Sequence, residues 1–201
     1  MPIHKPRIGL LGGTFDPVHY AHLHMAEVAK KECGLDEIWF VPAKLPPHKQ
    51  DRSLSSVEDR LNMLRLALEP VSYFKLCLAE LKREGPSYTI DTVLHLKRTY
   101  PDTQFYFIIG EDLLGTLHQW HRSEELVQNI TFIVLTRPGF NQADRIQWEE
   151  KIERVSMIPF HLSSSLIRRR VQEGKSIRFL VPDPVCHYIE QNKLYVHYNS
   201  G

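Results

Sequence analysis

Two histidines three residues apart, His19 and His22, are the first side chains in this sequence whose type and spacing suggest chemistry. They follow a short apolar run, the glycine pair Gly12 and Gly13, and then Asp16-Pro17. Adjacent glycines let the backbone turn sharply and approach a ligand closely. Asp before Pro is typical of an N-cap and first helical position, so both histidines should lie on one side of the helix's first turns.

Such a helix start is an anion site, because its unpaired N–H groups and the positive end of its dipole point at the ligand. Two imidazoles there can contact the phosphates of a nucleoside triphosphate and stabilise the charge developing on pyrophosphate. A His-x-x-His pair alone could also be a metal site or ordinary packing, but HExxH and a nearby third ligand are missing. The glycines Gly9, Gly12 and Gly13 do not match the dinucleotide pattern GxGxxG, and no GK[ST] follows them as in a P-loop. We therefore interpret residues 12–27 as a triphosphate-binding helix terminus with two well-placed histidines.

A second anion-binding pattern is LSSSLIRRR at residues 162–170. Three serine hydroxyls stand just before a predicted helix, and Arg168 follows in its early turns. Hydroxyls, backbone N–H groups and a guanidinium together suit a phosphate cradle opposite the first one. Arg169 and Arg170 are typical of a solvated basic face.

The elements that must position these residues alternate along the chain. Nearly continuous apolar runs predict buried parallel strands at residues 7–11, 37–41, 74–78, 104–109, 129–135 and 155–158. Helices are expected between them at residues 17–31, 56–68, 89–100, 113–117 and 123–128, the second with a capping box from Ser55 and Glu58. This alternation predicts an α/β, Rossmann-like, doubly wound parallel sheet, whose ligands bind beyond the carboxyl ends of the strands.

The last forty residues break the pattern, with helices expected at 163–173 and 184–191 and no strand between them. We predict a Rossmann-like core at residues 1–160 and a small helical subdomain at 161–201, packed on the sheet's edge within the same globular unit. Residues 140–153 are hard to assign, and we expect a loop with a short helix there.

Composition excludes several classes of protein. The chain has 201 residues, 42% of them hydrophobic, and a net charge of +1 from 25 basic and 24 acidic residues. This balance gives no global field for a nucleic-acid polymer or an anionic membrane, and no apolar run is long enough to span a bilayer. Three scattered cysteines, with no CxxC pair, indicate a cytoplasmic protein rather than a disulfide framework. The oligomeric state stays open, a homo-oligomer included.

The run GGTFDPVHYAH resembles the GGxFDPxHxGH motif of the nucleotidylyltransferase superfamily and, with the rest of the chain, the bacterial nicotinate-nucleotide adenylyltransferases. The further matching motifs occur in order and are VPAKLPPHK (41–49), GPSYTIDTV (85–93), FIIGEDLL (107–114), WHR (120–122), TRPG (136–139), LSSSLIR (162–168) and the tail at 176–195. The first motif alone would not separate this family from pantetheine-phosphate or glycerol-phosphate relatives.

The resemblance implies that ATP reacts with nicotinate mononucleotide to give deamido-NAD and pyrophosphate. Mg²⁺ is expected to accompany ATP and to bridge its phosphates with mostly water as its other ligands, so we name no protein ligand for it. The resemblance also implies catalytic roles for His19, His22 and Arg168. The implied ATP-binding residues are Gly12, Gly13, Thr14, Phe15, His19, His22, Gly110, Asp112, Ser164, Ser165 and Arg168. The implied mononucleotide-binding residues are Lys44, His48, Lys49, Ser87, Tyr88, Thr89, Trp120 and Arg137.

Some of these residues have simpler interpretations. Trp120 would stack on the pyridine ring, although a tryptophan taken alone is typical of packing. Asp112 would bind a ribose hydroxyl or cap a helix. Lys44, His48 and Lys49 flank Pro46-Pro47 in a segment, residues 42–52, that could form a basic lid or a solvated turn.

Two residues depart from the family pattern: Ala21 replaces a glycine, and Glu111 replaces an alanine beside Asp112. Alternative functions are a nicotinamide-mononucleotide or phosphopantetheine adenylyltransferase on the same fold, or a nucleotide sensor without catalysis.

Overall fold

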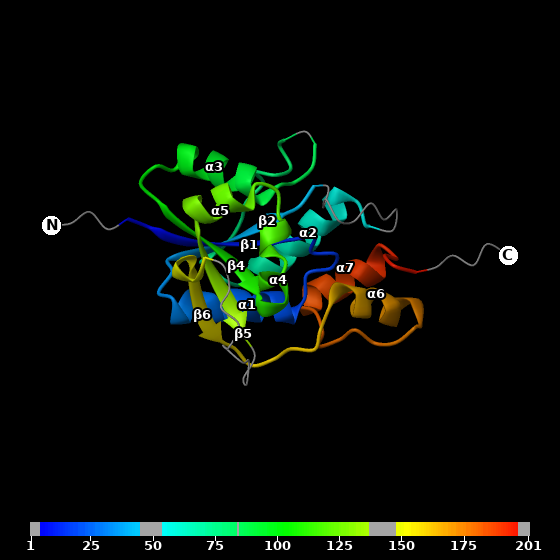
Figure 1. Cartoon of the computed structure of the whole chain (residues 1–201). Coiled ribbons are helices and arrows are strands. Elements are labelled where there is room, and N and C mark those ends of the chain that lie inside the picture. The colour runs from blue at the N-terminus through cyan, green and yellow to red at the C-terminus, as the bar shows by residue number, and fades with distance from the viewer. Residues whose placement is uncertain (1–4, 45–53, 84, 137–147, 197–201) are drawn as a thin grey trace.

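The computed structural model describes residues 5–44, 54–83, 85–136 and 148–196, and its centre is one parallel sheet (Figure 1). The strands are β1 (Arg7–Gly13), β2 (Glu37–Pro42), β3 (Phe74–Leu76), β4 (Gln104–Gly110), β5 (Thr131–Thr136) and β6 (Ile152–Ser156). They pair in the order β3-β2-β1-β4-β5-β6, every neighbouring pair parallel. The predicted doubly wound fold is confirmed. The strand order reverses between β1 and β4, where such folds bind ligands.

Helices cover both faces of the sheet (Figure 1). The helices are α1 (Tyr20–Glu32), α2 (Val57–Leu68), α3 (Thr89–Thr99), α4 (Glu111–Leu114), α5 (Ser123–Asn129), α6 (Ser164–Gln172) and α7 (Asp183–Gln191), with 3-10 turns η1 (Leu117–Gln119) and η2 (Glu149–Lys151). On β1, Leu11 packs with residues of α1 and α2, whereas Leu10 packs with residues of α3 and α5. Both faces of the strand are therefore buried, which explains its continuous apolar sequence.

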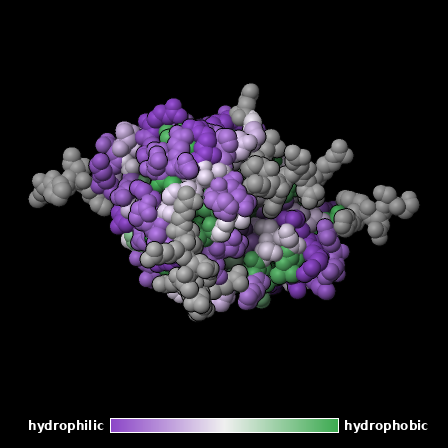
Figure 2. Space-filling view, in the orientation of Figure 1, coloured by the Kyte–Doolittle hydropathy of each residue, from purple (hydrophilic) through white to green (hydrophobic). Residues whose placement is uncertain are grey.

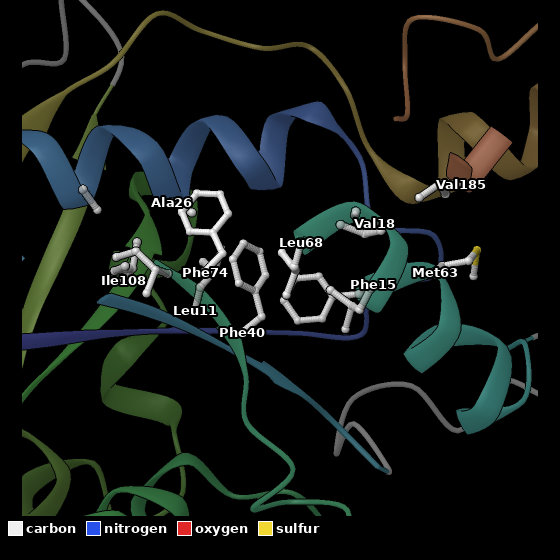
Figure 3. Packing of buried hydrophobic residues seen from close by; sticks show 14 of the residues in the cluster. Leu11, Phe15, Val18, Ala26, Phe40, Met63, Leu68, Phe74, Ile108 and Val185 are labelled. Atoms are coloured by element: carbon white, nitrogen blue, oxygen red, sulfur yellow. The ribbon is translucent and has the colours of Figure 1, made fainter. Parts of the chain in front are cut away.

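Phe15 anchors the loop after β1 in the core. Its side chain is 1% exposed and lies beside Phe40 and Leu68 in the cluster shown in Figure 3. Burying an aromatic side chain of this size stabilises the fold by about 2–3 kcal/mol. The residue also adopts a φ of 52°, a left-handed conformation that side chains rarely take. Packing of the Phe15 side chain thus stabilises a backbone conformation that is unfavourable for this residue on its own.

Two helix starts differ from the sequence-based predictions. Helix α1 begins at Tyr20 with His19 as its N-cap, rather than at Pro17 with Asp16 as the cap. The Asp16 carboxylate instead accepts hydrogen bonds from Ser55 N–H and the Tyr195 hydroxyl. The cap of α2 is Ser56, which accepts from Asp59 N–H, so the expected box from Ser55 is wrong by one residue.

The remaining differences are shifts in boundaries. Strand β6 covers Ile152–Ser156 instead of 155–158. The helix expected at 113–117 divides into α4 and η1. Strand β3 ends at Leu76, and β5 begins only at Thr131 because α5 continues to Asn129.

The C-terminal helices α6 and α7 join the core on the α1 and α2 side, where α7 contacts α2. Ile167, Val181 and Val185 are fully buried in the cluster that also contains Leu11 and Phe15. Tyr20 N–H donates to the Leu180 carbonyl at 3.2 Å. These contacts bring the start of α6 towards the start of α1. No helix among the described residues is long and apolar enough to cross a membrane.

Candidate nucleotide site

The two histidines stack at the start of α1. Their ring centroids are 3.6 Å apart and their planes are inclined by 16°. The spacing therefore places both rings on one side of the helix, as expected. Because α1 begins at Tyr20, His19 is the N-cap and His22 is the third helical residue.

His19 is buried, with 3% of its surface exposed. Burial lowers its pKa to about 4, so the ring is neutral at pH 7. Within the described residues its Nδ1 is buried and has no hydrogen-bond partner. A buried polar atom without a partner is costly in a folded protein, and a bound ligand or water could satisfy this one.

His22 is held by the backbone at the helix start. Its Nδ1 accepts a hydrogen bond from His19 N–H at 3.3 Å. In a neutral imidazole the other nitrogen, Nε2, then carries the proton and acts as a donor. The Phe15 ring lies edge-on to His22 with centroids 5.0 Å apart. The ring is thereby fixed in both tautomer and orientation, as a preorganised donor to a phosphate must be.

The glycines after β1 leave room for aromatic rings. A Cβ at Gly13 would lie 3.0 Å from the Phe15 ring, and a Cβ at Gly12 would lie 3.0 Å from the Phe107 ring. Both distances are shorter than ordinary van der Waals contacts, so either substitution would displace an aromatic side chain. Besides freeing the backbone, these glycines allow the close packing that shapes the loop.

A pocket of about 320 Å³ opens between the starts of α1 and α6 and the carboxyl ends of β4 and β5. Its polar lining residues are His19, His22, Glu111, Asp112, Ser163, Ser164 and Ser165. Its apolar lining residues are Ala21, Met25, Leu135, Met157, Pro159, Phe160 and Leu162. Anionic and apolar parts of one ligand could therefore bind at different ends of this pocket.

The three serines at the start of α6 have different roles. Ser163 caps the helix by accepting from Leu166 N–H. Ser164 donates its hydroxyl proton to the Pro17 carbonyl at 2.9 Å, so its oxygen could only accept from a further ligand. Ser165 accepts from Arg168 Nη2 at 3.3 Å, which leaves its own proton to donate elsewhere. Ser163 and Ser165 thus each keep a hydroxyl proton that a phosphate could accept without rearrangement, whereas Ser164 does not.

Arg168 links α6 to the loop after β1. Its Nη1 donates to the Asp16 carbonyl at 2.7 Å, while its Nη2 donates to Ser165. The guanidinium lies next to the pocket-lining serines but is not itself part of the pocket lining. Its charge stands near the predicted phosphate position, and its hydrogen bonds hold the two predicted cradles together.

At the end of β4, Gly110, Glu111 and Asp112 line the pocket together. The Asp112 carboxylate folds over Gly110, where an added Cβ would lie 2.5 Å from Asp112 Oδ1. Because Gly110 has no Cβ, the Asp112 carboxylate can lie against its backbone. The two departures from the family pattern, Ala21 and Glu111, both face this pocket. Ala21 is 7% exposed, so its methyl group forms part of a buried wall.

The predicted mononucleotide residues gather elsewhere, around the turn before α3. Lys44 N–H donates to the Ser87 hydroxyl at 3.1 Å, and Lys44 Nζ donates to the Arg83 carbonyl. Tyr88 stacks on His121 with centroids 4.1 Å apart, and Thr89 is the first residue of α3. None of these residues lines the 320 Å³ pocket.

Trp120 packs edge-on against Phe107 and Phe132, with centroids 6.0 and 6.3 Å apart. Packing is thus one role of this side chain, and Phe107 connects it to Gly12 on β1. The predicted residues His48, Lys49 and Arg137, and most of the predicted lid, lie outside the described residues.

Several residues that hold the site were not predicted. Arg60, 2% exposed, donates through Nη1 to the Thr14 carbonyl at 2.9 Å and to the Ala43 carbonyl at 2.8 Å. Glu80 accepts from Thr92 Oγ1 at 2.9 Å and also contacts the Ser87 hydroxyl. Tyr195 donates to Asp16. These partners are far apart in sequence, and only the folded chain brings them together.

Comparison with known proteins places this geometry in a family. Residues 10–170 match the family model described as cytidylyltransferase-like. A protein of Bacillus cytotoxicus named probable nicotinate-nucleotide adenylyltransferase is 48% identical over 189 residues, covering 94% of this chain and 98% of the relative. A protein of the same name from Bacillus anthracis is 47% identical with the same coverage.

Solved structures agree with these relatives. Plasmodium falciparum nicotinic acid mononucleotide adenylyltransferase complexed with NaAD superposes with a TM-score of 0.76 at 25% identity, covering 94% of this chain and 97% of that one. The same enzyme complexed with APC gives the same score over 96% of this chain and 98% of that one. A putative nicotinate-nucleotide adenylyltransferase from Vibrio parahaemolyticus shares the fold, with a TM-score of 0.68 at 16% identity over 94% and 95% of the two chains.

Proposed function

The chain belongs to the cytidylyltransferase-like family and, within it, to the nicotinate-nucleotide adenylyltransferases, and we propose that its own site transfers the adenylyl group of ATP to nicotinate mononucleotide. The observation that carries this proposal is the stacked pair His19 and His22 facing the start of α6 across one pocket. Two sets of donors around one cavity suit a triphosphate. Deamido-NAD and pyrophosphate are the products.

The reaction needs no nucleophile from the protein. The phosphate oxygen of the mononucleotide attacks the α-phosphorus of ATP in line, and the bond to the bridging oxygen of pyrophosphate breaks. Catalysis then depends on positioning and on stabilising the charge that moves onto the leaving group. His22 Nε2–H and the Ser165 hydroxyl would donate to phosphate oxygens, with Arg168 supplying positive charge nearby.

The base and ribose of ATP would occupy the remainder of the pocket. Its apolar side, which includes Met157 and Phe160, suits a purine ring. Ile158, Phe160 and Phe179 are exposed near α6, and Figure 2 shows apolar surface in that part of a mostly hydrophilic face. Asp112 would hydrogen-bond the ribose, as its place at the pocket rim allows.

The mononucleotide would bind between the turn before α3 and the loop after β1. Ser87 and Lys44 are already linked there by a hydrogen bond. Backbone N–H groups of residues 87–89 would meet the nicotinate carboxylate, and Trp120 would present an aromatic surface to the pyridine ring. The basic side chains of residues 44–49 would neutralise its phosphate.

We propose that Mg²⁺ enters as Mg-ATP. Among the described residues no group of three or more His, Cys, Asp or Glu side chains is placed to hold a metal ion. Phosphate oxygens and water would then supply most of its ligands, as is common for Mg²⁺. We also propose a cytoplasmic enzyme, since Cys33, Cys77 and Cys186 are all buried free thiols.

The decisive experiment compares two pyridine mononucleotides side by side. Purified protein with Mg-ATP should release pyrophosphate with either nicotinate or nicotinamide mononucleotide, with the higher kcat/KM for nicotinate. A higher kcat/KM for nicotinamide mononucleotide would contradict the substrate assignment. A higher kcat/KM for phosphopantetheine, tested in the same assay, would also contradict it. Nucleotide binding without any pyrophosphate release would indicate a sensor instead of an enzyme.

A further inference from the structure

Tyr195, close to the C-terminal end of the described chain, reaches the loop that carries the two histidines. Its hydroxyl donates to Asp16 Oδ1 at 2.6 Å, joining residues 179 positions apart in sequence. Asp16 is 1% exposed, so this hydrogen bond forms in a buried setting. The tail follows α7, which lies against α2 (Figure 1).

Asp16 also accepts hydrogen bonds from other segments of the chain. Its second carboxylate oxygen accepts from Ser55 N–H at 3.2 Å, and its carbonyl accepts from Arg168 Nη1 at 2.7 Å. The buried Arg60 guanidinium holds the neighbouring Thr14 carbonyl. Asp16 is therefore the point at which the tail, α6 and the segment before α2 all meet the loop.

The path of this loop determines where the imidazoles lie. Asp16 comes three residues before His19, and its neighbour Phe15 packs edge-on against His22. The backbone at Phe15 has a left-handed φ of 52°, which requires support from the surroundings. A small shift at Asp16 would move both rings away from the phosphates, and catalysis tolerates little such movement.

We propose that Tyr195 is a positioning residue for adenylyl transfer, acting through Asp16 to hold His19 and His22 in place. The inference rests on the proposed function only for its kinetic readout. It makes the C-terminal segment part of the catalytic machinery, although Tyr195 itself does not line the pocket.

A matched control is available on the same helical unit. Tyr188 also ties the C-terminal part to α2, donating to Asp59 Oδ1 at 3.0 Å and accepting from Asn62 Nδ2 at 3.1 Å. Among the described residues its hydroxyl makes no hydrogen bond to the loop after β1, so it ties the C-terminal part to α2 without the link to the histidines. Tyr195→Phe and Tyr188→Phe each remove one hydroxyl and nothing else.

Tyr195→Phe should lower kcat about tenfold, the size expected for losing a hydrogen bond to a charged group, with KM for ATP and the mononucleotide within about twofold of wild type. Tyr188→Phe should retain wild-type kcat. Combining Tyr195→Phe with Asp16→Asn should cost little beyond Asp16→Asn alone, because both changes break one link. Unchanged kcat in Tyr195→Phe, or equal losses in both tyrosine variants, would overturn the proposal.

A second measurement does not depend on activity. The imidazole NMR resonances of His22 should shift in Tyr195→Phe and stay in place in Tyr188→Phe. Coinciding His22 resonances in wild type and Tyr195→Phe would contradict the proposal even if the proposed reaction proved wrong. Wild-type pyrophosphate release, measured first, reports separately on the proposed function.

Discussion

The loop at residues 14–17 and the turn at residues 85–89 hold the two halves of the candidate site in different ways. The loop is mostly buried and receives hydrogen bonds from residues dispersed through the chain, namely Ser55, Arg60, Ser164, Arg168 and Tyr195. The turn begins with the exposed residues Gly85 and Pro86 and is held mainly through Ser87.

This difference matches what each half must do. Charge builds up on the pyrophosphate during the reaction, so the donors on the triphosphate half must already be in place. The mononucleotide half must bind its substrate but contacts less of the developing charge. Changes around the loop should therefore act mainly on kcat, whereas changes around the turn should act mainly on the KM of one substrate.

The largest effect is expected from His22→Ala. Removing a preorganised donor to the leaving group should lower kcat by two to three orders of magnitude, or about 3–4 kcal/mol. Steady-state pyrophosphate release measures it, and circular dichroism checks that the variant is folded. His24→Ala, on the same helix, should keep near-normal turnover, because among the described residues His24 does not line the pocket and touches it only through its ring contact with Phe160.

Near-normal turnover of His22→Ala would remove His22 from the mechanism. Equal losses in the two histidine variants would trace the effect to α1 as a whole. Either result would break the contrast between the two halves.

The free energy of unfolding should depend on pH through His19, which lies on the triphosphate half of the site. Burial lowers its folded pKa to about 4 from an ordinary 6.5, so the unfolded state binds a proton that the folded state excludes between these values. The free energy of unfolding should therefore fall as pH drops from 6.5 towards 4, by about 3 kcal/mol from this residue. Urea unfolding of wild type and His19→Gln across this range isolates the contribution. If the free energies of unfolding of the two proteins depended on pH in the same way, His19 would have an ordinary pKa and the loop would be accessible to solvent.

On the mononucleotide half, Glu80→Gln should raise KM for nicotinate mononucleotide about tenfold with little change in kcat. The buried carboxylate accepts from Thr92 and contacts Ser87, and its pKa is raised by its burial. An amide has one oxygen acceptor and would loosen the turn that Ser87 anchors. Initial rates with each substrate varied in turn measure the effect, and Glu124→Gln on the exposed side of α5 is the control. A fall in kcat with unchanged KM would place Glu80 with the triphosphate half.

Sequence motifs found the residues at the loop and at α6 because they are consecutive and surround helix starts. The alternation of apolar runs predicted the sheet for the same reason, since each strand is buried on both faces. The start of α1 was misjudged because the pair Asp16-Pro17 is a good local cap, and its carboxylate is diverted by Tyr195 and Ser55, which only the fold brings near.

The sequence gives weaker indications of the residues that support the site through buried hydrogen bonds. Arg60 lies in a helix whose sequence suggests an exposed charge, yet it is buried against the carbonyls of Thr14 and Ala43. Glu80 stands in an irregular stretch, and its partner Thr92 lies in α3. A polar residue at a position facing the core is the signal that could have found both, but it does not identify the partner.

The smallest effect separates two neighbouring serines at the start of α6. Ser165 has a hydroxyl proton to offer a phosphate, whereas Ser164 already donates its proton to the Pro17 carbonyl. Ser165→Ala should therefore raise KM for ATP about fivefold, or about 1 kcal/mol, by removing a ligand contact. Ser164→Ala should leave KM for ATP within about twofold and lower kcat modestly, because it loosens the loop. The reverse pattern would mean that Ser164 releases Pro17 when ATP binds, and the loop would then be rebuilt by its substrate instead of held ready by the fold.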